Sequence, residues 1–254
     1  MSGAAALIRQ YFGDGHYPAG YRNESKDASI DASGTLVKAV LLNSGVEMEG
    51  RKLAVGSGTQ SSVMYDSIQG FGRVNLTATL RLPGKKNIVM RAIDRLTVKD
   101  GEKMPFQVVV NNTLCGGGGT GKELRATLVW ADPPGSSGCT KCLINDLDLT
   151  LIDDKTGKTY YPNDMGSGGD HRNNVERIVV PATEVGEDGA SYTATVDAYN
   201  LDTSDQQFSL VMSGCFNFDG QDDFGFAVPS RAGRSLLLAP AAMAALLSAA
   251  FFII

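Results

Sequence analysis

The chain has 254 residues, a mass of 26.9 kDa and a hydrophobic fraction of 43%, which is enough to bury a core and excludes a disordered protein. The formal net charge is −5 and the sequence has no cluster of Lys and Arg, so electrostatics give no support to a nucleic-acid partner. An acidic surface of this kind is compatible with secretion or with cation binding.

The first part of the chain predicts two helices. The first covers residues 2–12 and ends near Gly13. The second covers residues 35–43, where capping residues precede an apolar stripe and Asn43-Ser-Gly45 ends it. An irregular Gly/Ser-rich segment follows, and then Gly70-Phe-Gly-Arg-Val-Asn75, whose glycines permit a tight turn.

After Leu80 the sequence predicts short strands separated by Gly, Pro, Asp and Asn. Evenly spaced strands with such turns indicate a mainly β fold, an antiparallel β-sandwich or jelly roll. The expected strands cover residues 91–98, 106–110, 123–130, 146–152, 175–180, 191–198 and 207–213.

Four cysteines, Cys115, Cys139, Cys142 and Cys215, allow three disulfide pairings that the sequence does not separate. A redox pair or half of a zinc site at Cys139 and Cys142 is less favoured, because a redox pair usually begins a helix and Leu143 here leads into a strand. Disulfides and glycosylation tripeptides are consistent with a secretory route. The tripeptides begin at Asn23, Asn75 and Asn111.

The two ends of the chain bear on localisation. No signal peptide precedes the body, which suggests that the true start is missing. Residues 235–254 carry no charge and are long enough to span a bilayer as an apolar helix, so we expect a membrane or glycolipid anchor behind a polar linker at 217–234. The expected location is extracellular or at the cell surface, anchored in the membrane through this tail.

Polar clusters between residues 128 and 176 are the candidate functional site. Leu147, Leu149 and Leu151 alternate with Asp146, Asp148 and Thr150, which places two carboxylates side by side on one strand face. We expect that face to be solvated, and hard oxygen donors there favour calcium over acid–base chemistry, with structural turn and sheet-surface roles as the alternative. The candidate metal ligands are Asp146, Asp148, Asp164, Asp170, Asn173 and Glu176.

Residues 3–7, 36–44 and 70–75 resemble the last elements of a subtilisin-like serine protease (subtilase) catalytic domain. The chain enters the family's nucleophile helix near its end, with Ser2-Gly3-Ala4 matching the residues after the catalytic serine. The resemblance implies that the serine, histidine and aspartate of the triad precede Met1. His16 and His171 are the two histidines present, and neither has an obvious serine partner, so this chain alone is predicted to be inactive, with no catalytic residue of its own.

The second half resembles the jelly-roll domain that follows the catalytic domain in a branch of alkaline subtilases. The resemblance covers roughly residues 80–214 and implies calcium in such a domain, without fixing its ligands. It is carried by Leu128-Val-Trp-Ala-Asp-Pro-Pro-Gly135, Asn145-Asp-Leu-Asp-Leu149, Tyr161-Pro-Asn-Asp164, Asn173-Asn-Val-Glu176, Tyr199-Asn200 and Phe208-Ser-Leu210.

These resemblances divide the chain into a remnant of a catalytic α/β domain at 1–79, a β-sandwich at 80–216, the linker and the tail. The implied function is the C-terminal part of a serine endopeptidase that cleaves peptide bonds by acyl transfer. Its sandwich stabilises the catalytic domain, here the missing N-terminal partner, or guides protein and peptide substrates. The alternative is a non-enzymatic cell-surface β-sandwich that binds a glycan or protein, with exposed aromatics such as Tyr160, Tyr161 and Tyr199 as the platform.

Overall fold

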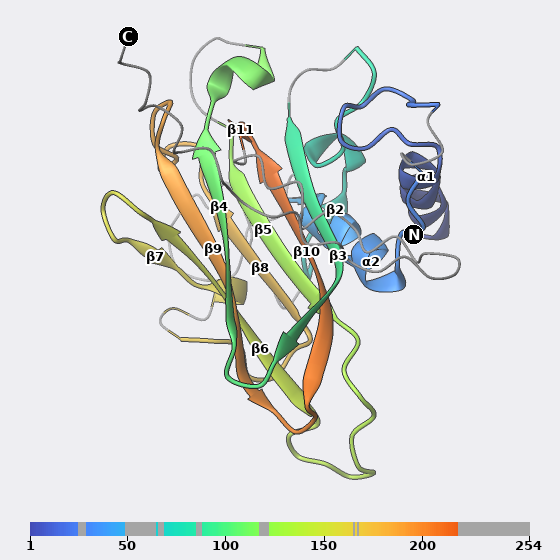
Figure 1. Cartoon of the computed structure of the whole chain (residues 1–254), viewed down its shortest axis with the longest axis vertical. Coiled ribbons are helices and arrows are strands. Elements are labelled where there is room, and N and C mark those ends of the chain that lie inside the picture. The colour runs from blue at the N-terminus through green and yellow to red at the C-terminus, as the bar shows by residue number, and fades with distance from the viewer. Residues whose placement is uncertain are drawn as a thin grey trace, which may run out of the picture.

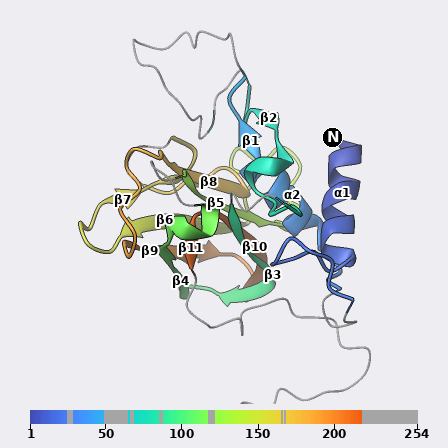
Figure 2. The same cartoon turned by 90° about the horizontal axis from the view of Figure 1, so that it is seen from above.

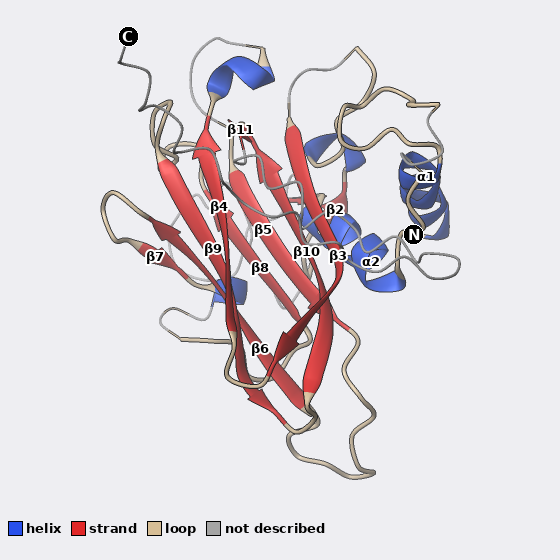
Figure 3. Cartoon of the chain, viewed as in Figure 1, coloured by secondary structure: helices blue, strands red, loops and turns tan. Residues whose placement is uncertain are grey.

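A computed structural model describes residues 1–24, 29–48, 65, 69–84, 88–116, 122–164, 166 and 168–217. In this part of the chain the fold is mainly β, with two antiparallel sheets facing each other (Figures 1 and 3). One sheet has the order β3 (Val89–Lys99), β10 (Asp205–Gly214), β5 (Leu124–Trp130), β8 (Val175–Val180). The other has the order β11 (Phe216–Asn217), β4 (Lys103–Val110), β9 (Ser191–Leu201), β6 (Asn145–Asp153), β7 (Thr159–Tyr160).

All the predicted strands are present, so the expectation of antiparallel sheets is confirmed. Their ends lie within a few residues of the expected positions. The sequence did not predict β7 and β11, nor the pair β1 (Gly45–Val46) and β2 (Arg73–Val74). Each of these has two residues, which is too short to show an alternating pattern.

The main core lies between the two sheets. Along β9 the inward side chains are fully buried while Thr and Asp alternate with them on the other face. Leu147, Leu149 and Leu151 of β6 face the same core, as their alternation predicted. Trp130 is buried at the end of β5, and its indole N–H donates to the backbone oxygen of Asn145 at 2.9 Å, which satisfies its polar atom.

The helices cover the outer face of the β3-β10-β5-β8 sheet (Figure 2). Helix α1 (Ser2–Gly13) packs on α2 (Gly34–Asn43), and α2 packs on the strands. Leu36 and Val40 of α2 are completely buried in a second core with Met90, Ala92 and Val211. This sheet is therefore buried on both faces, which accounts for the uninterrupted burial along β5 and β8.

If the helix over 35–43 packed only on the sheet of a catalytic domain, as the subtilase resemblance implies, its apolar face would be partly exposed in this chain. The structure shows that this expectation is wrong for α2. The outer face of the β3-β10-β5-β8 sheet takes the place of that sheet, so the apolar stripe of α2 is covered by strands of this chain.

Both ends of α2 are attached to the sheet by buried polar groups. Before its first turn, Ser33 contacts the carboxylate of Asp94 on β3. Past its last turn, Arg125 of β5 donates to the backbone oxygens of Asn43 and Gly45 at 2.9 and 3.2 Å. A helix C-terminus has carbonyl groups without helical partners, and a buried guanidinium satisfies them here. Arg177 of β8 adds a donor to Gly45 at 2.7 Å.

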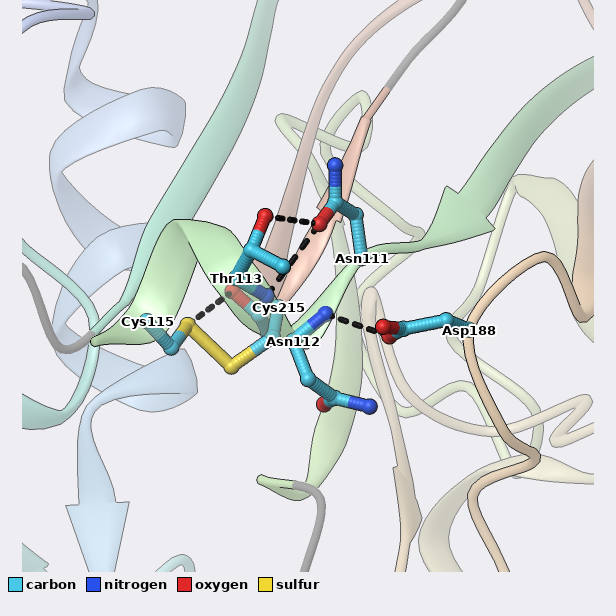
Figure 4. Close-up of a disulfide and its surroundings, with 7 residues drawn as sticks. Asn111, Asn112, Thr113, Cys115, Asp188 and Cys215 are labelled. Atoms are coloured by element: carbon cyan, nitrogen blue, oxygen red, sulfur yellow. Dashed lines mark hydrogen bonds between the residues drawn. A yellow bond between two sulfur atoms is a disulfide. The ribbon is translucent and has the colours of Figure 1, made fainter. Parts of the chain in front are cut away.

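The described part of the chain contains two disulfides. Cys115 and Cys215 join the short helix η3 (Asn112–Cys115) to the residue before β11, as Figure 4 shows. Cys139 and Cys142 close a four-residue loop between β5 and β6. The disulfide prediction is confirmed, and the structure supplies the pairing. All four cysteines are oxidised, so none is available as a thiolate for zinc.

The predicted linker from residue 218 and the apolar tail at 235–254 lie outside the described residues. Within the described ranges, no helix combines the length and the apolar character that crossing a membrane requires.

Candidate functional site

Asp146 and Asp148 share the outer face of the β11-β4-β9-β6-β7 sheet, as their spacing predicted. The expectation that they are solvated is wrong, because only 1% of Asp146 and 9% of Asp148 is exposed. The segment between β7 and β8 folds over this face and covers both carboxylates. Its backbone comes so close at Gly169 that a Cβ atom there would lie 1.8 Å from Oδ1 of Asp148. Glycine is therefore needed at this position for the cover to close.

A β-bulge places an aromatic ring beside the two carboxylates. Asp146 pairs with Asn200 and Leu147 pairs with Ala198, so Tyr199 is an extra residue in β9. Its ring stacks on His171 with centroids 4.4 Å apart and an interplanar angle of 23°. The outer side of Tyr199 stays exposed to solvent. The bulge thus holds the imidazole ring of His171 against the acidic face of β6.

The imidazole approaches both carboxylates. Nδ1 of His171 lies 3.0 Å from Oδ2 of Asp146 and 3.6 Å from Oδ1 of Asp148. One oxygen or nitrogen from each residue lies within 4.8 Å of the others. We call Asp146, Asp148 and His171 the Asp–Asp–His cluster. Lys141, on the loop closed by Cys139 and Cys142, donates to Oδ2 of Asp146 at 3.2 Å.

Three atoms of this cluster are buried without a hydrogen-bond partner. They are Oδ1 of Asp146, Oδ1 of Asp148 and Nδ1 of His171. The approach of Nδ1 to the carboxylates is close enough for an ion pair but is not aligned as a hydrogen bond. Buried polar atoms are nearly always paired, so three such atoms at one point are characteristic of a site that takes a further group.

The other predicted ligands form an adjacent hydrogen-bonded group. Asp170 is buried, and its Oδ2 accepts from the side chains of Asn163 and Asn173 at 2.7 and 2.6 Å. Its Oδ1 accepts from the backbone N–H of Arg172, which makes an Asx-turn. Glu176 is completely buried and accepts from the backbone N–H groups of Leu149 and Asp170.

This adjacent group braces the covering segment. Asp170, Asn173 and Glu176 thus have the structural turn and packing contacts that were the alternative to metal binding. Asp164 is the last residue of the short helix η4 (Pro162–Asp164), and its side chain lies outside the described residues. The structure therefore brings Asp146 and Asp148 together with His171, and uses the oxygens of Asp170 and Glu176 to hold the cover in place.

Burial dominates the electrostatics of the site. Burial raises the pKa of Asp148 to about 6, with His171 opposing the shift and Asp146 adding to it. Burial also raises the pKa of Glu176 well above its usual range, while the hydrogen bond from Leu149 opposes the shift. In both groups burial disfavours the ionised carboxylate and nearby carboxylates add to the effect, and a bound cation would offset both causes.

Sequence reasoning missed His171 and Lys141 as members of the site. His171 was visible within an acidic stretch, but its partners lie on β6 and are 23 and 25 residues earlier in the sequence. The folding of the covering segment brings them together, and that segment has no periodicity to predict its path. His16, the other histidine, stacks on Tyr11 in the N-terminal part, with ring centroids 5.8 Å apart.

No protein-family model matches the chain. The chain is similar to curated proteins of Dictyostelium discoideum, among them three that are named serine protease/ABC transporter B family proteins. The protein tagD is 26% identical over an alignment covering 83% of this chain, tagA is 28% identical over 82%, and tagB is 26% identical over 89%. The chain spans only 11–13% of the length of these relatives.

Likeness to solved structures is weak. A crystal structure from Sulfurospirillum deleyianum has a TM-score of 0.27 and 11% identity, covering 52% of this chain and 98% of that one. A cyanophage Pam1 capsid structure has a TM-score of 0.26 and 13% identity, covering 57% of this chain and 96% of that one. Across most of its length, the chain is thus distantly similar in sequence to proteins that are named serine proteases.

Proposed function

We propose that the chain is the C-terminal part of a subtilisin-like serine endopeptidase and that its β-sandwich, of the jelly-roll type, is an accessory domain that stabilises the catalytic domain. The distant similarity to proteins named serine proteases supports this proposal. The order of the two resembling regions supports it as well. The region that resembles the end of a catalytic domain (residues 1–79) precedes the region that resembles the jelly-roll domain (roughly residues 80–214), as in the family. The catalytic serine, histidine and aspartate would precede Met1 and cleave peptide bonds by acyl transfer.

The attachment of α2 to the sheet is the observation that carries the proposal. In the subtilase resemblance α2 belongs to the catalytic domain, yet here its apolar face is buried on strands of the sandwich. Its N-cap residue Ser33 contacts Asp94, and the backbone oxygen of its last residue, Asn43, accepts from Arg125. A catalytic domain that includes α2 would share one packed core with the sandwich, instead of being joined to it by a loose linker.

This arrangement gives the sandwich a mechanical role in catalysis. Helix α1 packs on α2 through Ile8 and Phe12, which are completely buried. In the proposed protein, α1 continues the helix that bears the catalytic serine. The sheet therefore fixes α2, α2 fixes α1, and the position of α1 determines the position of the serine. Catalytic groups must be held within a fraction of an ångström, so loosening this chain of contacts lowers the rate.

An active-site-directed fluorophosphonate probe tests the proposal. We expect no labelling of the chain itself, and labelling of a longer protein that adds the residues encoded upstream of Met1. Substituting Asp94→Ala in the longer protein should reduce the rate of labelling, or shorten the half-life of the labelling activity at elevated temperature, because the substitution detaches the start of α2. Labelling that is unchanged after removal of residues 88–217 would overturn the accessory role, and an upstream sequence without a serine, histidine and aspartate triad would overturn the protease.

An extracellular or cell-surface location is part of the same proposal, with residues 235–254 as the membrane anchor. The Cys115–Cys215 disulfide supports an oxidising compartment. Asn111, the first residue of a glycosylation tripeptide, lies near that disulfide (Figure 4). Surface biotinylation of intact cells should label the protein, and recovery of unlabelled, fully reduced protein from the cytosol would contradict this location.

The glycan-binding alternative receives less support from the geometry. Of the three tyrosines considered for a platform, Tyr199 is exposed, while Tyr160 and Tyr161 are half-buried. Tyr199 already stacks on His171, and Tyr160 lies under the ammonium group of Lys158, 4.7 Å from its ring centroid. The rings of Tyr199 and Tyr160 thus already pack against other side chains of this protein.

A further inference from the structure

We propose that Asp146, Asp148 and His171 bind one divalent transition-metal ion of the zinc type. The site lies on the outer face of β6, under the segment that connects β7 to β8. It is independent of the protease function proposed above, because it uses only residues within the described sandwich.

The buried atoms without partners carry the proposal. Asp146 is almost completely buried, and its Oδ1 has no hydrogen-bond partner. Oδ1 of Asp148 and Nδ1 of His171 are also buried atoms without a hydrogen-bond partner. Leaving a buried polar atom unpaired destabilises the fold, and the cost is larger if the atom is charged. One cation that coordinates these three atoms would remove the cost at all of them.

The spacing agrees with coordination to a small ion. Atoms held about 2.0–2.2 Å from zinc in a tetrahedral arrangement lie about 3.4 Å from one another. Nδ1 of His171 lies 3.6 Å from Oδ1 of Asp148, which is almost the required separation. Oδ1 of Asp146 belongs to the carboxylate whose other oxygen lies 3.0 Å from the same nitrogen, and one oxygen or nitrogen from each of the three residues lies within 4.8 Å of the others.

The type of donor selects the metal. Calcium takes six to eight oxygen ligands, whereas imidazole nitrogen favours zinc and its neighbours among the transition metals. The nearby oxygens that calcium would need on Asp170 and Glu176 already accept hydrogen bonds from the covering segment and from Leu149. Two carboxylates and one imidazole leave one tetrahedral position for water.

The site is held in shape before metal binding. Stacking on Tyr199 fixes the plane of the His171 ring. The backbone of Gly169 lies directly against Asp148 and restricts that carboxylate. Lys141 is the competing cation, but it contacts Oδ2 of Asp146 and leaves Oδ1 without a partner. Its side chain is 56% exposed, so it can move into solvent when a metal ion enters.

Isothermal titration of the full chain with zinc chloride tests the proposal. The chain is purified in detergent without a polyhistidine tag, treated with a chelator and dialysed. We expect one equivalent of zinc to bind, and His171→Gln to weaken that binding at least tenfold. His16→Gln is the matched control, because it removes the other histidine and should leave the affinity unchanged.

Two further measurements make the test specific. Lys141→Met removes the competing ammonium group and should tighten zinc binding. Circular dichroism of each variant checks that the fold is intact, which we expect for His171→Gln because 39% of that side chain is exposed. Zinc binding by the His171→Gln variant that equals binding by the parent chain would overturn the proposal. It would also be overturned if calcium competed with zinc for the site and the His171→Gln substitution left calcium binding unchanged.

Discussion

Asp94 on β3 accepts hydrogen bonds from both the backbone N–H and the hydroxyl group of Ser33, the residue that caps α2. The N–H lies 3.0 Å from the carboxylate, and Ser209 of β10 donates to the same group at 2.8 Å. A bulge in β3 near Asp94 directs this side chain outward, toward the helix. One buried carboxylate thus joins a helix to two strands.

Asp94→Ala should lower the free energy of unfolding by about 2–4 kcal/mol, because it removes one buried acceptor from four donors: the N–H and hydroxyl of Ser33, the hydroxyl of Ser209 and the guanidinium of Arg95. Urea denaturation monitored by the fluorescence of Trp130, the single tryptophan, measures the change. Asp202→Asn changes an exposed carboxylate and should alter the stability by less than about 0.5 kcal/mol. Equal effects of the two substitutions would show that Asp94 does not hold α2.

Gly169→Ala should destabilise the segment that covers Asp148. The added Cβ would overlap a carboxylate oxygen at 1.8 Å, and the buried Asp148 has little room to move. We expect a loss of about 1–3 kcal/mol together with weaker zinc binding. Gly3→Ala is the control, since a Cβ there meets nothing within 4 Å and alanine favours a helix. If both variants melt like the parent protein, the close contact at Gly169 is not rigid.

Stability of the metal-free protein should fall as the pH rises through about 6. The pKa of Asp148 is raised to about 6 in the folded state, so the folded chain binds its proton more tightly than the unfolded chain does. This contribution is fully present below the ordinary carboxyl pKa near 4 and is lost as the pH passes the raised value. Glu176 changes the stability in the same direction.

Thermal melting in EDTA between pH 4.5 and 7.5 measures this dependence. Asp148→Asn should flatten the profile, since the variant has no carboxyl group to titrate at that position. Saturating zinc should also raise the melting temperature most at neutral pH, where the carboxylates are ionised and bind it best. A parent profile that rises with pH over this interval would contradict the assignment of the shift to burial.

The two disulfides should differ in their contribution to stability. Cys115 and Cys215 are separated by 100 residues, whereas Cys139 and Cys142 are separated by three. In the chain-entropy account, the longer loop stabilises the fold by about 4–5 kcal/mol and the shorter one by about 2 kcal/mol. Replacing each pair by serine and comparing urea midpoints tests this, and a larger loss for the Cys139/Cys142 pair would contradict it.

The long strands were predictable because each one has either a polar face that alternates with core residues or a continuous run of core residues. In β9, for example, Tyr192, Ala194, Val196 and Ala198 alternate with polar residues, and the structure buries them as that pattern requires. The facing of Asp146 and Asp148 followed from the same rule. Their burial did not, because it depends on a covering segment whose position comes from Gly169 and from hydrogen bonds made by Asp170 and Glu176.

The partners of His171 were beyond sequence reasoning for a related reason. Its contact with Asp146 needs both the path of the covering segment and the bulge at Tyr199, and neither has a local signature. The disulfide pairing also follows from the strand order, since β11 must lie beside β4 before Cys215 can reach Cys115. Local patterns predicted the elements, and long-range packing determined the site.

The two-sided burial of the β3-β10-β5-β8 sheet also determines where the chain can be divided. A fragment that begins after residue 80 would keep every long strand but would lose α2, and its outer sheet face would be exposed to water. The uncovered side chains would be Met90, Ala92, Val129, Val175 and Val211. A continuous apolar face of this kind promotes association between copies. The smallest soluble unit therefore begins before α2, inside the region that resembles a catalytic domain.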